Sequence, residues 1–321
     1  MSPCRAVARL PDGKVSPVEP SSIDELLRDQ ATPVWLDIQD PAEADITLLR
    51  EEFGFHELSV EDAARRGQRP KVDEYDGYYF IVVYAASCGP DAGVRTHEIH
   101  CFWGKNYVVT LHDGALPEVE AAMQRWSHAE DPEEQTVAHQ VYALLDAVVD
   151  GYFPVLDAIA DRISDIESEI FDGRPGSLRV LFELRWELLK ARRVLAPSRD
   201  VVNILIRRDI PVFPPALVPY LADVYDHAIR VIDTLDLQHE LLSSAVETHL
   251  TVTSNQLNQT MRTMAALTIA LMAPTLIAGI YGMNFLLTPT GDWGLSFPVV
   301  VSAMALIGGG ILIVFKRVGW L

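Results

Sequence analysis

Basic residues and paired cysteines are scarce in this sequence of 321 residues. It holds 26 Lys and Arg against 45 Asp and Glu, for a formal net charge of −19. Nucleic-acid binding depends on basic surfaces, so this balance argues against nucleic acid as a partner and favours divalent cations. The three cysteines, Cys4, Cys88 and Cys101, form no CxxC pair, which excludes a disulfide framework and is typical of a reducing compartment.

Charge is absent from two stretches near the C-terminus, Met264–Tyr281 and Phe297–Phe315. After Met261 the charged residues are Asp292, Arg262, Lys316 and Arg317. A bilayer core of about 30 Å needs about 20 apolar residues in a helix, so both stretches are long enough to span it. We therefore predict two transmembrane helices, with a pair of buried core helices as the alternative.

The flanking charges predict the orientation of the two spans. Arg262 precedes the first span, and Lys316 and Arg317 follow the second. Because basic residues favour the cytoplasmic side, we expect both ends in the cytoplasm and residues 286–296 outside. The N-terminal sequence MSPCRAVARLPDGK lacks the apolar core of a signal peptide. We expect a multi-pass protein of the cell (inner) membrane, with the N- and C-termini cytoplasmic and lipid around the spans.

Residues 1–145 predict an α+β cytosolic domain. Strand composition marks VWLDI, YYFIVVYAA and a hairpin formed by HEIHCFW and NYVVTLH around Gly104 and Lys105. Between them, ADITLLREEFG and SVEDAARRG are typical of helices. Residues 146–215 predict a cytosolic helical hairpin around the turn FDGRPGS. Its first arm carries Asp150, Asp157, Asp161 and Asp165 near one face, which indicates either a solvated surface or one that attracts cations.

Proline and glycine are absent from Tyr220 to Ala273, which excludes the usual helix breaks. We predict one stalk helix over residues 216–281 that continues into the first span, with about 80 Å in its unbroken part. Apolar residues recur along it at alternating steps of three and four: Leu221, Val224, Ala228, Val231, Leu235, Leu242 and Ala245. This seam predicts packing on copies of the same helix, and therefore an oligomeric stalk.

A second row follows the same helix at seven-residue spacing: Asp226, Asp233, Glu240, Glu247, Ser254, Met261, Thr268, Thr275 and Gly282. Offset from it by four residues lie Asn258, Ala265, Met272 and Gly279. Threonine within a membrane often bonds its own backbone or a neighbouring helix. Because Thr268 and Thr275 align with Asn258 and Asn284, we predict that this face lines a pore.

The segment YGMNF, Tyr281–Phe285, opens the predicted external loop of residues 282–296. An asparagine beside a hydrocarbon run is unfavourable unless its amide faces water, protein or an ion. One interpretation is a helix cap formed by Gly282 and Asn284. The other is a ring of neutral amide oxygens that accepts hydrogen bonds from hydrated Mg²⁺, which usually keeps several waters. Neutral oxygens bind weakly enough to release the ion, as conduction requires.

The stretch IAGIYGMNF, followed by a short loop, a second span over 297–315 and a basic tail over 316–321, resembles the CorA family of divalent-cation channels. The resemblance covers almost the whole chain and includes VWLDIQDP, FGFHELSVED through QRPKV, GKNYVVT and ADVYDH in order. It implies a funnel-shaped homopentamer with a long stalk helix and two transmembrane helices per chain. It also implies Mg²⁺ influx, gated by Mg²⁺ bound between cytosolic domains.

The resemblance assigns roles to individual residues. The selectivity filter falls on Gly282, Met283 and Asn284, and pore-lining or gating positions fall on Glu247, Asn258, Met261, Met264, Met272 and Thr275. Thr268 and Gly279 join the pore lining from the rows described above. Regulatory metal sites match Glu61, Asp62 and Asp223. Two departures are the single acid, Asp292, in the external loop and the weakly basic tail KRVGWL.

Two other functions stay open at this stage. Zinc transport has slight support from His97 and His100 in HEIH, with Cys101 next to them, although a strand would point the two histidines to opposite faces. A membrane-anchored metal sensor that conducts nothing is the other. Co²⁺ and Ni²⁺ are open alternatives to Mg²⁺ as the transported ion. We expect no enzyme, because the sequence has no phosphate loop, nucleophile elbow or HExxH motif.

Overall fold

The computed structural model describes residues 4–10, 13, 15–19, 23–29, 31–89, 93–172, 177–207, 214–282 and 293–320. The chain forms two compact units. The first comprises Met1–Ser168 and Gly176–Ser244, and the second comprises Glu169–Pro175 and Ala245–Leu321. One helix, α8, contributes residues to both units.

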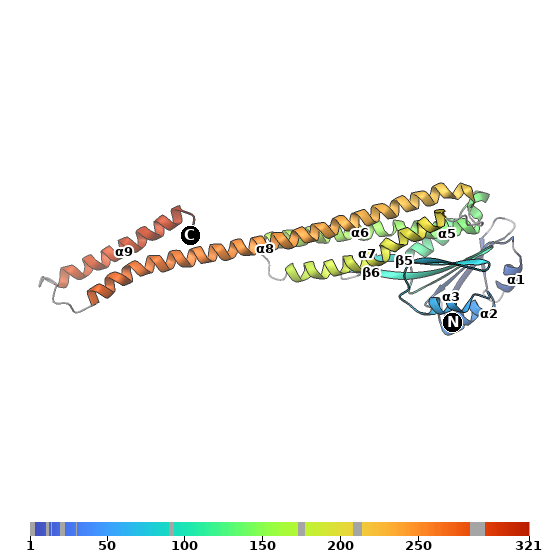
Figure 1. Ribbon diagram of the computed structural model, residues 1–321, viewed down its shortest axis with the longest axis horizontal. Helices are drawn as coiled ribbons and strands as arrows, with labels where there is room; N and C mark the ends of the chain where they lie inside the picture. The colour runs from blue at the N-terminus through green and yellow to red at the C-terminus, as the bar shows by residue number, and fades with distance from the viewer. Residues whose placement is uncertain are drawn as a thin grey trace. The chain divides into compact units, whose positions relative to one another are not determined.

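A seven-stranded mixed sheet forms the centre of the first unit (Figure 1). Its strands are β1 (Cys4–Arg9), β2 (Val15–Val18), β3 (Val34–Gln39), β4 (Lys71–Tyr75), β5 (Tyr78–Cys88), β6 (Val94–Gly104) and β7 (Tyr107–His112). They are ordered β2-β1-β3-β7-β6-β5-β4, with β3 and β7 parallel and the other described pairs antiparallel. The strands predicted at VWLDI and YYFIVVYAA and the hairpin after Trp103 are confirmed; β1, β2 and β4 add to them.

The helices are α1 (Ile23–Arg28), α2 (Glu43–Glu51), α3 (Glu57–Ala64), α4 (Pro117–Ser127), α5 (Val137–Asp150), α6 (Tyr152–Phe171), α7 (Ser177–Arg207), α8 (Val218–Gly282) and α9 (Trp293–Arg317). Short 3₁₀ turns lie at Pro132–Gln135 and Pro215–Leu217. The predicted boundary between the α+β domain and the helical hairpin, at residues 145 and 146, falls inside α5. Helix α7 continues through Pro197 to Arg207.

Helices cover both faces of the sheet. On one face, the ring of Phe55, next to α3, stacks on Phe102 of β6 with a centroid distance of 4.2 Å. On the other face, Trp35 of β3 lies 6.4 Å from Trp126 of α4. Alternate side chains of the central strands β3, β5, β6 and β7 therefore enter two separate apolar layers, as the pleat of a sheet requires. Figure 1 shows α2 and α3 on one side of the strands and α5 and α7 on the other.

The predicted unbroken helix from Tyr220 to Ala273 is confirmed as part of α8. The prediction that its apolar seam packs on copies of the same helix is wrong, because the seam is buried within the single chain. Its seven residues are between 0% and 4% exposed. Gln238 donates a hydrogen bond to the Leu156 carbonyl of α6, and Asp236 pairs with Arg192 of α7 at 2.6 Å. In the first unit, the residues of this stripe from Leu221 to Leu242 therefore complete a helical layer of their own chain.

Candidate ion pathway and cation sites

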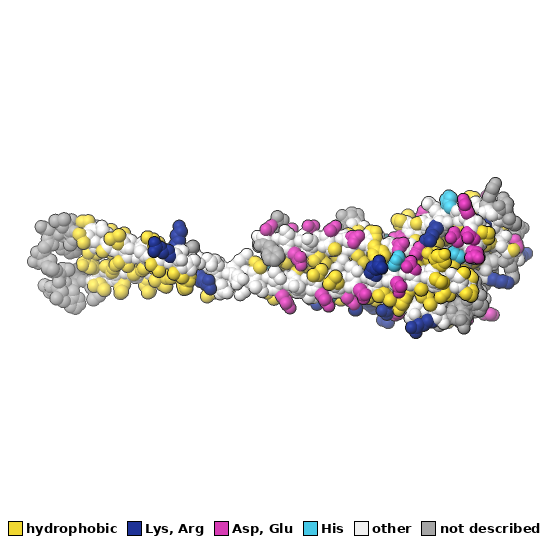
Figure 2. All heavy atoms as spheres, turned by 90° about the horizontal axis from the view of Figure 1, so that it is seen from above, with side chains coloured by type: hydrophobic (Ala, Val, Ile, Leu, Met, Phe, Trp, Pro, Cys, Tyr) yellow, Lys and Arg dark blue, Asp and Glu magenta, His cyan; other side chains and the backbone are white. Residues whose placement is uncertain are grey.

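Among the residues that the structure describes, two helices are long and apolar enough to cross a membrane: the one over Pro215–Gly282 and the Pro298–Arg317 part of α9. Their most apolar windows have mean hydropathies of 1.9 and 2.4. Only 11% of the first window and 0% of the second is buried inside the chain, which argues against core helices. Figure 2 shows hydrophobic side chains along the surface of this part of the chain.

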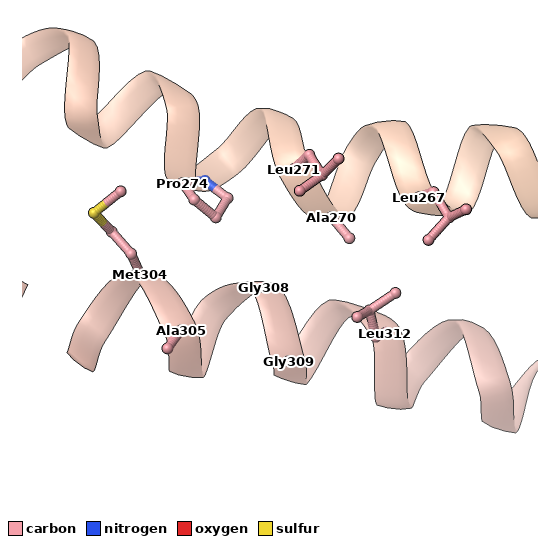
Figure 3. A pocket seen from close by; sticks show the side chains of 9 residues that line it. All are labelled: Leu267, Ala270, Leu271, Pro274, Met304, Ala305, Gly308, Gly309 and Leu312. Atoms are coloured by element: carbon pink, nitrogen blue, oxygen red, sulfur yellow. The ribbon is translucent and has the colours of Figure 1, made fainter. Parts of the chain in front are cut away.

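Small residues allow α8 and α9 to pack closely in the second unit. Ala266 and Ala270 of α8 are buried, with exposed fractions of 0% and 5%. A Cβ atom added at Gly308 of α9 would lie 3.3 Å from the Ala270 carbonyl oxygen. A groove of about 330 Å³ beside this contact is lined by apolar residues, including Leu267, Pro274 and Met304 (Figure 3). Such small-residue contacts are typical of helix pairs in membranes.

The predicted pore row lies on the face of α8 that points away from α9. With Ala270 at the centre of the α9 contact, a helical rotation of about 100° per residue fixes the other positions. Met261, Thr268, Met272, Thr275 and Gly279 fall within about 40° of the opposite side, and Met264 falls about 60° from it. These side chains are exposed in the single chain, with values of 67% for Met261, 66% for Met264 and 63% for Met272. One continuous face of α8 is thus left uncovered by its own chain.

The two intramembrane threonines satisfy their donors locally. The Thr268 hydroxyl donates to the Met264 carbonyl and the Thr275 hydroxyl to the Leu271 carbonyl, both at 2.8 Å. In the single chain, both threonines therefore bond to the backbone of their own helix, which was the alternative to a pore-lining role. This bonding leaves the lone pairs of each hydroxyl oxygen available, because a hydroxyl is both donor and acceptor. The exposed oxygens can accept hydrogen bonds from water around an ion.

Other predicted positions lie toward the two ends of the pathway. Glu247 and Asn258 are exposed on α8, and no charged residue separates Glu247 from Arg262. Gly282 ends the helix, and a Cβ atom there would meet no atom within 4 Å. Met283 and Asn284 lie outside the described residues, as does most of the predicted external loop.

Glu61 and Asp62 lie on α3, and both are half-buried. The Nζ of Lys71, on β4, lies 2.6 Å from Asp62 and 2.5 Å from Asp73. Burial opposes the charge of Lys71, but hydrogen bonds from its ammonium to these two carboxylates raise its pKa. Glu61 pairs with Arg65 at 2.5 Å, one turn along the chain. Both candidate ligands therefore already have cationic partners.

Asp223 lies on α8 within an acidic patch. Its carboxylate is 68% exposed and lies 4.0 Å from His227, whose other ring nitrogen lies 3.4 Å from Asp150. Nearby Asp146 is half-buried, and this burial raises its pKa despite a hydrogen bond from Arg125. The patch concentrates negative charge around an accessible carboxylate, which favours cation binding.

Within the described ranges, no three His, Cys, Asp or Glu side chains are grouped closely enough to hold a metal ion. Glu61 and Asp62 lie on α3 and Asp223 on α8, and the single chain forms no complete cage from them. The histidines considered for zinc are engaged separately: His97 bonds Ser87, and buried His100 bonds Glu98. Sequence reasoning missed Lys71, although the alternation Lys71, Val72, Asp73 in a strand would place Lys71 and Asp73 on one face.

Comparison with known proteins identifies the family. Residues 30–317 match the family described as CorA-like Mg²⁺ transporter protein. The chain is 32% identical over 287 residues to YfjQ of Bacillus subtilis, covering 89% of each chain. It is 31% identical over 299 residues to the cobalt/magnesium transport protein CorA of Thermotoga maritima, covering 92% of this chain and 85% of that one. The complete structure of the CorA magnesium transporter from Methanocaldococcus jannaschii superposes with a TM-score of 0.83 at 21% identity, over 99% and 98% of the two chains. The chain belongs to the CorA-like Mg²⁺ transporter family.

Proposed function

We propose that this protein is a divalent-cation channel that admits Mg²⁺ to the cytoplasm across the cell (inner) membrane. The observation that carries the proposal is the uncovered face of α8, where Met261, Thr268, Met272 and Thr275 lie opposite the helix α9. The threonine hydroxyls of this face can accept hydrogen bonds from water around an ion, and the face carries no charge that would trap the ion. Relatives named for cobalt and magnesium transport support these two ions as cargo, and Ni²⁺ is a further candidate.

The pathway requires several copies of the chain, because a single helix cannot enclose water. We propose a homopentamer, as the family resemblance implies, with lipid around α9 and both termini in the cytoplasm. Arg262 before the first span and Lys316 and Arg317 after the second support this orientation. The uncovered face of each α8 would then line one central pore.

Selectivity is assigned to Asn284, with Gly282 and Met283 beside it. Mg²⁺ keeps several of its waters, and a ring of side-chain amide oxygens can bind that hydrated ion without removing them. Gly282 supports the arrangement, because the open space around its Cα lets neighbouring backbones approach. Glu247 and Asn258 would mark the cytoplasmic part of the same path.

Regulation is assigned to Asp62, with Glu61, and to Asp223. Mg²⁺ is usually bound through one or two carboxylates together with several waters. We propose that one such ion bridges Asp62 of one subunit and Asp223 of the next. Bound Mg²⁺ would neutralise like charges at this contact and hold the closed state. Its loss would let the cytosolic parts separate and the pore open.

Ion flux into liposomes tests the function. The wild-type protein should admit Mg²⁺ in a manner blocked by cobalt(III) hexammine, whose size resembles that of the hydrated ion. Asn284→Ala should abolish selective Mg²⁺ flux and leave the oligomer intact on size-exclusion chromatography. A complete absence of flux in the wild type would favour a non-conducting sensor, and retained selectivity in the variant would contradict the amide ring.

A further inference from the structure

Three cations gather at one end of the two apolar helices of the second unit. From Ala245 onward, the basic residues are Arg262, Lys316 and Arg317, and all three side chains are exposed. No acidic residue occurs between Glu247 and Asp292 or after Asp292. Within the described part of the chain, the structure shows no ion pair for any of the three. Figure 2 shows basic side chains at the end of the hydrophobic surface.

The C-terminal tail brings the three cations to the same level. The hydroxyl of Thr263, next to Arg262, donates to the Trp320 carbonyl at 3.2 Å and is shared with the Gln259 carbonyl at 3.0 Å. Helix α9 ends at Arg317, and Gly319 adopts a positive φ of 77° that turns the chain. The Trp320 amide then donates to the Phe315 carbonyl at 2.9 Å. This arrangement, which we call the tail clasp, fixes the end of α9 against α8 beside Arg262.

The side chains around the tail clasp have the chemistry of a membrane interface. The ring of Trp320 stacks on Phe315 at 5.2 Å and is half-buried. Tryptophan favours the boundary between headgroups and acyl chains. An arginine guanidinium matches two phosphate oxygens at once, and a lysine ammonium adds a point charge. The sequence has no Asp or Glu side chain between Glu247 and Asp292, or between Asp292 and Leu321, that could compete with phosphate.

We propose that Arg262, Lys316 and Arg317 bind the phosphodiester headgroup of an anionic lipid in the cytoplasmic leaflet, with the tail clasp holding α8 and α9 in register for it. The inference rests on the membrane orientation proposed above. Basic residues beside a span are attracted to the negative potential of that leaflet. The lipid would tie the end of α9 to the point where α8 enters the bilayer.

Lipid retention by the full-length protein tests the proposal. The protein is reconstituted in vesicles of equal phosphatidylglycerol and phosphatidylcholine and extracted in mild detergent, and retained lipid is measured by mass spectrometry. The wild type should retain phosphatidylglycerol preferentially. Each neutralising substitution, Arg262→Gln, Lys316→Gln or Arg317→Gln, should lower this preference about fivefold if the electrostatic contributions are independent. Thr263→Val should lower it as well, with all three charges kept, because it releases the tail clasp.

Matched controls separate the site from general electrostatics. Neutralising Arg179, Lys190 and Arg193 of α7 removes the same charge from an exposed helix and should leave the preference unchanged. Excess inorganic phosphate should not displace the lipid, whose acyl chains add affinity; displacement would indicate a free-phosphate site and overturn the lipid assignment. An unchanged phosphatidylglycerol preference in the variant with Arg262, Lys316 and Arg317 all changed to Gln would overturn it too, whether or not that variant keeps the oligomer. Because the readout is binding, these outcomes are independent of whether the protein conducts Mg²⁺.

Discussion

The ammonium of Lys71 lies 2.6 Å from the carboxylate of Asp62, so the chain already places a cation at its proposed regulatory ligand. Since the pKa of Lys71 is raised, the ammonium stays charged at neutral pH, and its contribution to stability is lost only as the pH rises through that raised value, above 10.5. A divalent cation that binds Asp62 must therefore displace Lys71 or share the carboxylate with it. Lys71 is expected to set the Mg²⁺ concentration at which the channel closes.

Replacing this competitor should strengthen inhibition by Mg²⁺. Lys71→Met keeps an unbranched side chain that is one atom shorter and removes its charge. Half-maximal closure should therefore need about two- to fivefold less Mg²⁺, the range expected for a partly exposed ion pair. Patch recordings with graded cytoplasmic Mg²⁺ measure the shift. The exposed Lys190→Met on α7 is the control and should leave the curve in place. If Lys71→Met leaves the Mg²⁺ inhibition curve unchanged, Asp62 is not a regulatory ligand.

A buried carboxylate holds the loop that connects α3 to β4. Glu98 accepts hydrogen bonds from the Gly67 and Gln68 amides at 2.6 and 2.9 Å, and His100 lies 2.9 Å away. Glu98→Gln keeps one acceptor oxygen and replaces the other with an amide NH₂ group. That NH₂ group would face a backbone N–H donor, so the free energy of unfolding should fall by about 1–3 kcal/mol. Thermal unfolding measures the lost stability, and hydrogen exchange should be faster at the Gly67 and Gln68 amides. The exposed Glu130→Gln should change neither.

The same carboxylate predicts a pH dependence. Burial alone would raise the pKa of Glu98, but the hydrogen bonds from His100 and from the Gly67 and Gln68 amides outweigh it and lower the pKa. Its contribution to stability is therefore present above the ordinary value of 4.5 and is lost as the pH falls through the lowered value. Below about pH 4.5 the wild type should lose stability more steeply than Glu98→Gln. Parallel acid-unfolding curves would contradict a charged Glu98.

Cysteine substitution distinguishes the two faces of α8. Thr275 lies on the uncovered face, whereas Ala273, at nearly the same depth, is half-buried on the side toward α9. In a background with Cys4 and Cys88 replaced by serine, a cationic methanethiosulfonate should block flux through Thr275→Cys and leave Ala273→Cys conducting. Mg²⁺ should protect Thr275→Cys by occupying the path. Block of both variants, or of Ala273→Cys alone, would place the pore on another face.

Helices and strands could be predicted from the sequence where the composition of the segment itself determines them. The apolar strands β3, β5 and β7 and the unbroken α8 follow from composition and from the absence of helix breakers. Strands β1, β2 and β4 were missed because they are short or polar and are defined by pairing, as when β1 joins β3 across a long stretch of sequence. The pore row was predicted as one face of α8, but the ion pair of Asp62 with Lys71 depends on tertiary contacts that spacing does not reveal.

The seam of α8 shows why periodicity identifies an apolar face but not what covers it. Leu235 is 1% exposed in the isolated chain, so Leu235→Ala should create a cavity in the first unit and lower its unfolding free energy by about 2–5 kcal/mol. If the seam were a contact between copies, the same change would first dissociate the oligomer at low concentration. Thermal unfolding and native mass spectrometry of the full-length variant separate these outcomes. Leu237→Ala, at a 56% exposed position on the same helix, is the control. A concentration-independent fall in melting temperature for Leu235→Ala, with the oligomer retained, is expected because the stripe supports its own subunit.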